Sequence, residues 1–351
     1  MPVCVSSAAL RHHDWSAGGY DRNAEFDKKA GMDALSDVLR VAQLTGGVFL
    51  HANFFEPWCI QARVPREHCG PALGSGSHLI VYHYVIEGEV HIRVEGADQR
   101  GAVIGNGEIV LLARNDPHLM GSDLSLPPVL GRDIVQPPKD GGLYSIHHGG
   151  NGRRTRMICG FLGCAGGDVN PVITTLPPLL KMSVNDGISA EWIRSTFQFA
   201  AQEVAAGRPG SETVLAKLSE LLFVETVRCH AESLPKDQTG WLAGLREPHV
   251  AKALALLHRD IARDWTVDDL GREAGLSRSA LADHFLRLIG MPPMHYLANW
   301  RMQVAAERLR HTSASLAQVA ETVGYESEAA FSRAFKKSFH MAPATWRRTN
   351  S

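Results

Sequence analysis

The arrangement of apolar and polar residues changes near residue 190. Between Gly47 and Asp123, short segments rich in β-branched and aromatic residues are separated by Gly or polar turns: GVFLHANF, IQARV, HLIVYHYVI, VHIRV, AVIG and EIVLL. This spacing is typical of strands in an antiparallel barrel or sandwich. From Glu191, apolar residues recur every three or four positions, in EWIRSTFQFAAQEVAA and then in SETVLAKLSELLFVETVRCHAE. That period predicts two packed helices.

A hydrophilic run, LPKDQTG from Leu234 to Gly240, precedes a region without any strand-like pattern. Polar segments of this kind commonly connect domains. We therefore expect a disordered extension over residues 1–31, a β-barrel domain with two packed helices over residues 32–232, a linker over residues 233–245 and an all-α domain over residues 246–348.

The helical domain contains an internal repeat. TVDDLGREAGLSRSALADHFLRLIGMPP from Thr266 can be written over SLAQVAETVGYESEAAFSRAFKKSFHMAP from Ser315. Each copy begins with a Ser or Thr followed three residues later by Asp or Gln, which is the pattern of a capping box. Each first helix then ends at a glycine, Gly275 or Gly324, suited to a left-handed turn, and a second amphipathic helix follows. The repeat predicts two helix-turn-helix units.

The segment between the two units has the length of a rigid spacer. Residues Met294 to Arg310 form one continuous helical pattern of 17 residues, which corresponds to roughly 25 Å. A spacer of this length can hold two recognition helices about 34 Å apart, one turn of duplex DNA. A single chain could then read two successive major grooves.

These residues resemble the DNA-binding domain of the AraC/XylS family, to which GYESEAAFSRAFKKSFHMAPATWRR from Gly324 is similar almost position by position. The resemblance implies that base-facing and phosphate-contacting residues lie on both second helices. The implied DNA-binding residues are Arg278, Ser279, Ala282, Asp283 and Arg287 in the first unit and Ser327, Glu328, Ala329, Arg333, Lys336 and Lys337 in the second. The alternative for each residue is an exposed position on an ordinary helical bundle.

The two expected reading helices are not equivalent. Ala282 and Asp283 offer no long hydrogen-bond donor to guanine, and Asp283 would repel phosphate. We expect Arg333, on the second reading helix, to carry more of the sequence recognition.

The strand-rich segment resembles the cupin-like sensor that precedes this domain in one AraC subfamily. The resemblance rests on YHYVIEGEVHIRV from Tyr82, GEIVLLARNDPH from Gly107 and HHGGNGRRTRMICGFLGC from His147. A catalytic cupin holds a metal with three histidines and a glutamate. Aligned on Gly88, the glutamate position is Val81, residues 74–77 contain no ligand, and His118 alone matches. We therefore expect no metal, no cofactor and no enzymatic activity, with a metal-dependent cupin enzyme as the less favoured alternative.

Polar side chains in the expected barrel are candidates for binding a small effector. His78, His83 and His118 lie among apolar strand residues, although His83 and His118 could equally be hydrogen-bonded wall residues. An alternative signal is an oxidant sensed by Cys159 and Cys164. Five residues of extended strand would separate these thiols by roughly 16 Å, so a disulfide requires a turn at the intervening glycines.

Charge and cysteine content indicate which partners and which cellular compartment suit the chain. From Arg246 onward the chain carries 15 Lys and Arg against 11 Asp and Glu, a net charge of +4 within a whole chain of net charge −1. The basic end suits contact with phosphate. Six cysteines without CxxC spacing indicate free thiols, and no segment resembles a signal peptide or membrane span.

Together these patterns favour a ligand-responsive transcription regulator in the cytoplasm. The expected partners are double-stranded promoter DNA, a small-molecule effector, a second copy of the chain in a homodimer and RNA polymerase. No membrane partner is expected.

Overall fold

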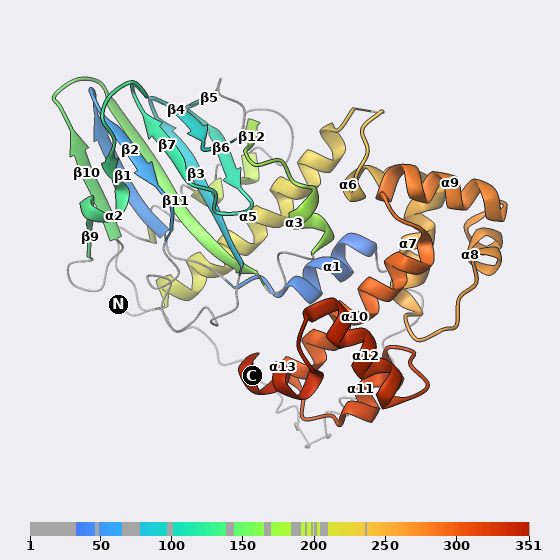
Figure 1. Cartoon of the computed structure of the whole chain (residues 1–351). Coiled ribbons are helices and arrows are strands. Elements are labelled where there is room, and N and C mark those ends of the chain that lie inside the picture. The colour runs from blue at the N-terminus through green and yellow to red at the C-terminus, as the bar shows by residue number, and fades with distance from the viewer. Residues whose placement is uncertain are drawn as a thin grey trace, which may run out of the picture. The chain divides into compact units, whose positions relative to one another are not determined.

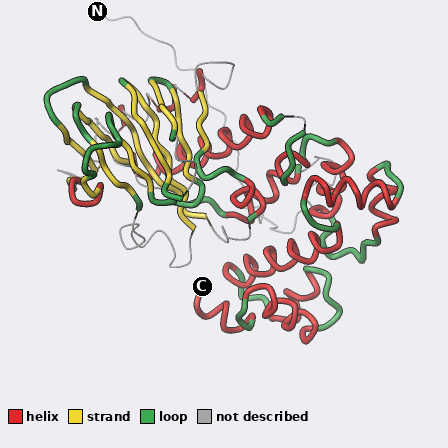
Figure 2. Tube along the Cα trace, turned by 45° about the horizontal axis from the view of Figure 1, so that its top comes forward, coloured by secondary structure: helices red, strands yellow, loops and turns green. Residues whose placement is uncertain are grey.

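The computed structural model describes residues 33–45, 49–64, 78–96, 101–137, 144–164, 170–183, 191–193, 195–197, 199, 202–203, 210–235 and 237–350. The expected extension over residues 1–31 lies outside this description. After one short helix at residues 34–42, the described chain forms mainly strands up to residue 183 and helices from residue 191 onwards. In Figure 2 the strands lie side by side in one region and most of the helices lie outside it. The expected fold class, a cupin-like N-terminal domain and an all-α C-terminal domain, is confirmed, although the strands form an open sandwich of two sheets (Figure 1) and do not close into a barrel.

The larger sheet has seven strands in the order β12-β6-β3-β11-β1-β10-β9, and the smaller has five in the order β5-β4-β7-β2-β8. Apolar side chains from both sheets, such as Val81 and Met157 from one and Ile60 and Ile92 from the other, form a single core between them. The strands are β1 (Phe49–Phe55), β2 (Cys59–Ala62), β3 (His78–Glu87), β4 (Glu89–Val94), β5 (Ala102–Gly105), β6 (Glu108–Leu112), β7 (His118–Gly121), β8 (Val129–Leu130), β9 (Val135–Gln136), β10 (Tyr144–Gly149), β11 (Arg154–Cys164) and β12 (Leu180–Ser183).

Two strand pairs correct the expectation of a purely antiparallel arrangement. Strands β1 and β10 pair in parallel, as do β2 and β8. The short helix α2 (Gly131–Ile134) connects β8 to β9. Because β8 and β9 have only two residues each, they are too short to produce a readable period.

Strand β3 is buried on both faces, which explains its continuous apolar run. Val81 and Val85 face the second sheet. On the opposite face, the Tyr82 hydroxyl lies 3.1 Å from the Ser219 hydroxyl, and the Tyr84 ring stacks on Phe197 with centroids 4.0 Å apart. Ser219 belongs to helix α5 (Ser211–Ser233), so α5 covers the outer face of the larger sheet. Residues 191–193, 195–197 and 202–203, in the first of the two expected helices, are also helical.

The turn that a disulfide between Cys159 and Cys164 would require is absent from the structure. Both residues lie in the single strand β11, and an odd spacing places their side chains on opposite faces. Cys159 packs in the core between the sheets, whereas Cys164 packs in the core on the helical side. Burial raises the pKa of each thiol to about 12, so both stay protonated at neutral pH. The structure therefore gives no support to the oxidant-sensing alternative.

The helical region continues the core of the preceding domain. Residues 241–244, inside the expected linker, form helix α6 (Trp241–Gly244), which is fully buried. Trp241 Nε1 donates a 2.9 Å hydrogen bond to the hydroxyl of Tyr296, which in turn lies 2.8 Å from Nε2 of His258. Asp37, on the N-terminal helix α1 (Ala34–Ala42), lies 3.8 Å from the other nitrogen of His258. These polar contacts thus connect helix α1, near the start of the described chain, with residues 241, 258 and 296 of the helical region.

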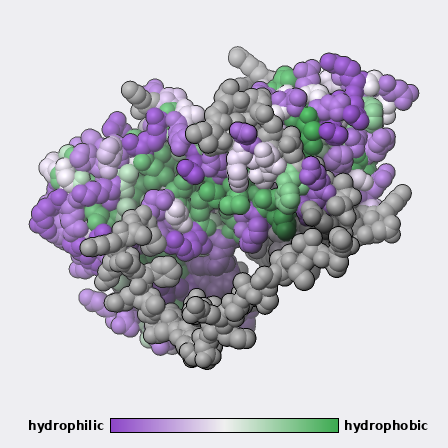
Figure 3. All heavy atoms as spheres, turned by 180° about the vertical axis from the view of Figure 1, so that it is seen from behind, coloured by the Kyte–Doolittle hydropathy of each residue, from purple (hydrophilic) through white to green (hydrophobic). Residues whose placement is uncertain are grey.

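The remaining helices are α3 (Pro171–Thr175), α7 (Pro248–Arg259), α8 (Val267–Ala274), α9 (Arg278–Ile289), α10 (Pro293–His311), α11 (Leu316–Thr322), α12 (Glu328–Phe339) and α13 (Pro343–Asn350). In the part of the chain that the structure describes, no helix combines the length and apolar character needed to cross a membrane. On the face drawn in Figure 3, hydrophilic residues cover much of the described surface and hydrophobic residues gather in smaller patches.

Candidate functional sites

Helices α8 and α9 form the first expected helix-turn-helix unit. Thr266 caps α8 by accepting a hydrogen bond from the backbone of Asp269, and its hydroxyl donates to the Asp269 carboxylate. The capping box is therefore only half formed, since the carboxylate binds the hydroxyl and not the backbone. Gly275 ends α8 with φ +87°, as the repeat predicts. Leu281 and Phe285 of α9 are buried, which leaves the opposite face of α9 exposed.

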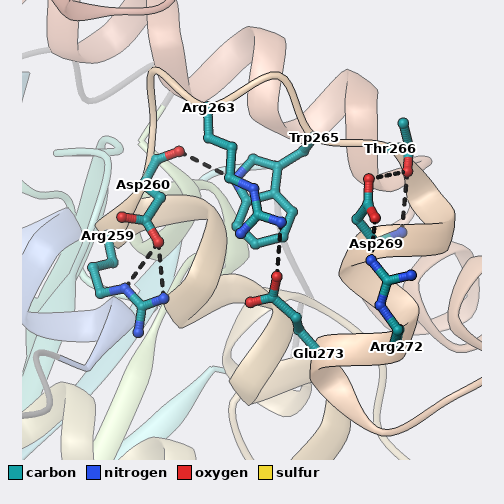
Figure 4. Close-up of polar contacts among 8 residues, drawn as sticks. All are labelled: Arg259, Asp260, Arg263, Trp265, Thr266, Asp269, Arg272 and Glu273. Atoms are coloured by element: carbon teal, nitrogen blue, oxygen red, sulfur yellow. Dashed lines mark hydrogen bonds and ion pairs between the residues drawn. The ribbon is translucent and has the colours of Figure 1, made fainter.

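Polar contacts hold the connection from α7 to α8 in place (Figure 4). Trp265 Nε1 donates a 3.1 Å hydrogen bond to the backbone carbonyl of Asp260 at the end of α7. The Arg263 guanidinium lies 3.7 Å above the Trp265 ring and forms a 2.8 Å ion pair with Glu273 on α8. These contacts set the position of α8, the helix that supports α9.

Helices α11 and α12 repeat the arrangement with a complete capping box. Ser315 accepts from the backbone of Gln318, and the Gln318 side chain accepts from the backbone of Ser315. Gly324 in the turn has φ +77°. Phe331 and Phe335 anchor α12 through its buried face. Both units therefore have the predicted arrangement of a helix, a glycine turn and a second helix.

Helix α10 connects the two units and has 19 residues, slightly longer than expected. Its rise of about 1.5 Å per residue gives a length of roughly 28 Å. Tyr296 and Trp300 are buried against the first unit, and Met302 and Leu309 are buried in the core of the second. One helix thus contributes to both cores, which suits the role of a rigid spacer.

The exposed face of α12 concentrates positive charge. Arg333, Lys336 and Lys337 are exposed, and the two lysines follow Arg333 by three and four positions, on one side of the helix. Within the described ranges, none of the three forms an ion pair. Glu328 and Ala329 are also exposed in the first turn, whereas Ser327 is the N-cap and accepts a bond from the backbone of Ala330.

The exposed face of α9 is mixed in charge. Arg278 lies 3.3 Å from Asp268 of α8, so an acidic neighbour already engages this cation. Ser279, Asp283 and Arg287 are exposed, and Ala282 is half-buried. The exposed face of α12 is therefore more positively charged than that of α9, as their sequences predict.

A residue outside the expected set also lies on the α9 face. Leu286 is 52% exposed and follows Asp283 by three positions. A helical wheel of α9 would have placed it there, but the expected set contained only polar and small residues. An exposed leucine on this face can make apolar contact with a thymine methyl group.

Two of the three candidate effector histidines meet inside the sandwich. The Nε2 atoms of His83 and His118 lie 3.2 Å apart, and Nδ1 of His118 lies 2.9 Å from the backbone carbonyl of Asp116. If His118 donates to that carbonyl, His83 donates to His118, and Nδ1 of His83 remains buried without a partner among the described residues. Burial lowers the pKa of His83 well below its ordinary value and that of His118 to about 4, so both rings are neutral at pH 7.

His78 lies apart from this pair, at a pocket of about 580 Å³ beside the ends of β2 and β4. Nε2 of His78 lies 2.6 Å from the backbone carbonyl of Ala113. Arginines from three separate segments, Arg63, Arg114 and Arg132, also line the pocket. Their wide separation along the chain left no local signal in the sequence.

Val81, at the position of the cupin glutamate, is buried in the core between the sheets. Among the described residues, no group of three or more His, Cys, Asp or Glu side chains is placed to hold a metal ion.

Comparison with known proteins shows a family match for each half of the chain. Residues 33–232 match the Cupin family, and residues 270–349 match a helix-turn-helix domain family. The chain is 33% identical to a putative AraC-like transcription regulator of Streptomyces lividans over 90% of this chain and 98% of that protein. It is 27% identical to the transcriptional regulator AlkR of Acinetobacter baylyi over 90% of this chain and 99% of that one.

A solved regulator from Chromobacterium violaceum with an AraC-type DNA-binding domain is 26% identical over 30% of this chain and 95% of its own, with a TM-score of 0.29. The family assignment rests on the Streptomyces relative and on the two family matches. With a cupin domain followed by two helix-turn-helix units, the chain belongs to the AraC-like transcription regulators, which bind DNA.

Proposed function

We propose that this regulator reads its operator mainly through α12 and that a small effector bound in the cupin domain controls its activity. The observation that carries the first part is the cluster of exposed cations Arg333, Lys336 and Lys337, free of ion pairs among the described residues. Arginine can bind the O6 and N7 atoms of guanine with two hydrogen bonds, and lysines beside it can contact phosphates. On α9, Ser279, Ala282, Asp283 and Leu286 contribute weaker or apolar contacts.

Substituting Arg333 tests this assignment. Operator sites would first be selected from random duplexes with the full chain. Arg333→Ala should weaken binding to the selected site by about 1–3 kcal/mol while changing the affinity for random duplex much less. Equal losses of affinity for both duplexes would mean that Arg333 contacts phosphate and takes no part in base recognition. Failure of the full chain to enrich any sequence would contradict specific DNA binding itself.

The remaining parts of the proposal concern the sensor. Nδ1 of buried His83, which has no partner among the described residues, and the pocket beside His78 support a ligand-binding role for the cupin domain over residues 32–232. We propose that this role is regulatory and non-enzymatic, as the names of the relatives suggest. We propose that the regulator acts in the cytoplasm, with RNA polymerase as a partner.

Helix α5 supports the proposal of a homodimer. Val214 and Leu221, two turns apart, are exposed on this helix, and Leu221 is 51% exposed. Leu221→Asp should shift the chain from dimer to monomer in sedimentation velocity, because a charge would be buried at the interface. Val103→Asp, a similar change at an exposed residue of β5, is the control. A monomeric parent chain, or a dimer that tolerates Leu221→Asp, would contradict this interface.

A further inference from the structure

The pocket beside His78 has the chemistry of a site for a small organic acid. It lies where the ends of β2 and β4 meet the connection from β6 to β7 and helix α2. Among the described residues, three arginines, Arg63, Arg114 and Arg132, line it together with one acidic residue, Glu95. Gln61 binds the Glu95 carboxylate through a 2.5 Å hydrogen bond.

The guanidinium groups are available to a ligand. Arg114 lies 3.5 Å from Asp116, and Arg132 lies 3.5 Å from Asp133, with both pairs open to solvent. Exposed pairs of this kind contribute about 0–1 kcal/mol, so an incoming anion can replace them. Arg63 forms no ion pair with any residue that the structure describes. Arginine is well suited to bind a carboxylate through two parallel hydrogen bonds.

The wall between these arginines is held by buried polar contacts. Asn115, 8% exposed and in a left-handed conformation with φ +52°, accepts from the backbone N–H of Val64 at 3.0 Å and donates to its carbonyl at 2.8 Å. The 2.6 Å contact of His78 with the Ala113 carbonyl ties the start of β3 to the same turn. These contacts fix the pocket wall before any ligand arrives, which lowers the entropic cost of binding.

The pocket also offers apolar surface. Val64, Leu79, Pro117 and Leu130 line it, and Leu130 is 37% exposed. Leu79 is only 4% exposed, but a ligand that covers Val64, Pro117 and Leu130 removes apolar area from water, which favours binding by about 25 cal/mol per Å². Charge and apolar surface together select a ligand with an anionic head and a compact apolar body.

We propose that this pocket binds a small monocarboxylic acid with an apolar body, and that this acid is the class of effector to which the regulator responds. The inference rests on the proposed sensor function and adds the chemical class of its ligand and the residues that hold it. The carboxylate is bound by the three arginines, and the apolar body lies against Val64, Pro117 and Leu130.

Calorimetric titration of the full chain tests the proposal with phenylacetate and hexanoate as probes. The matched uncharged probes are 2-phenylethanol and hexanol, and inorganic phosphate tests charge without an apolar body. We expect saturable binding and thermal stabilisation by at least one of the two acids, and much weaker binding of its alcohol and of phosphate. Arg63→Gln, Arg114→Gln and Arg132→Gln should each weaken binding of the acid about tenfold. Arg153→Gln, at an exposed arginine elsewhere in the sandwich, should leave it unchanged.

Four results would overturn the proposal: no binding of either acid, equal binding of acid and alcohol, equal binding of phosphate, or indifference to all three pocket variants. Selection of operator DNA by the same protein preparation separates these outcomes from failure of the proposed function. A chain that selects its operator but binds neither acid retains its role as a regulator and loses only this ligand class. Thermal unfolding of each arginine variant without ligand detects any loss of folding.

Discussion

At the scale of single residues, the paired rings of His83 and His118 show how burial determines the protonation state of a side chain. Neither ring is exposed, and their shared hydrogen bond requires at least one unprotonated nitrogen. A buried imidazolium would lose its hydration, and two charged rings would repel each other. The pair is therefore stable only in its neutral form, which makes the stability of the sandwich depend on pH.

The pKa of His118 is about 4 in the folded chain, against an ordinary value of 6.5. Below pH 6.5 the unfolded chain binds a proton that the folded chain excludes, so stability falls as the pH drops towards 4. For His118 alone the loss reaches about 3 kcal/mol, and His83 acts in the same direction. Urea unfolding at a series of pH values should show this decline, and His118→Gln should make it shallower.

His147→Gln, at an exposed histidine of β10, is the control and should keep the parent pH dependence. Protonation of carboxylates also lowers stability in acid, so the informative quantity is the difference between the two variants. An identical pH dependence for both variants would contradict the assignment of a strongly lowered pKa to His118.

At the scale of elements, the sequence predicts best where one local pattern determines the structure. The strands up to β6 and the two helix-turn-helix units follow from periodicity, capping residues and Gly275 and Gly324. Residues 241–244 appeared to be linker because a single turn of helix has no period, and only long-range contacts bury Trp241. The pocket arginines could not be grouped in advance for the same reason, since β2, the turn after β6 and α2 meet only through folding.

The glycine turn between α11 and α12 tests whether close packing and backbone conformation both matter. A Cβ atom at Gly324 would lie 2.7 Å from the carbonyl oxygen of Ala262 and 2.9 Å from its Cα, and φ is +77°. Gly290 has φ +80°, but nothing lies within 4 Å of a Cβ atom there. Gly290→Ala should cost about 1 kcal/mol from the left-handed conformation alone, and Gly324→Ala about 2–4 kcal/mol, because backbone must also move.

Denaturant unfolding of both glycine variants gives the comparison directly. Gly324→Ala should also weaken operator binding, because α12 can no longer hold its place on α11. Equal losses of stability at the two positions would mean that the Ala262 backbone yields to the new methyl group without cost.

At the scale of the whole molecule, a regulator with a net charge of −1 must attract a polyanion through the distribution of its charge. The Debye length in physiological salt is about 8 Å, so only cations at the DNA interface contribute strongly to the binding of DNA. The face of α12 that carries Lys336 and Lys337 is the candidate for that contribution, because these lysines are exposed and form no ion pair among the described residues.

Replacing Lys336 and Lys337 by Gln together should therefore weaken binding to operator and random duplex by a similar factor. Each phosphate contact that is lost should make the slope of log affinity against log salt concentration less negative by about 0.9. Arg153→Gln removes an exposed positive charge from the cupin domain, far along the chain from both helix-turn-helix units, and should leave the slope unchanged. If the double variant kept the parent slope, the phosphate contacts would have to lie elsewhere, and α9 with Arg287 would become the main candidate. A loss confined to the operator would instead mean that the lysines take part in base recognition, a role that we propose for Arg333.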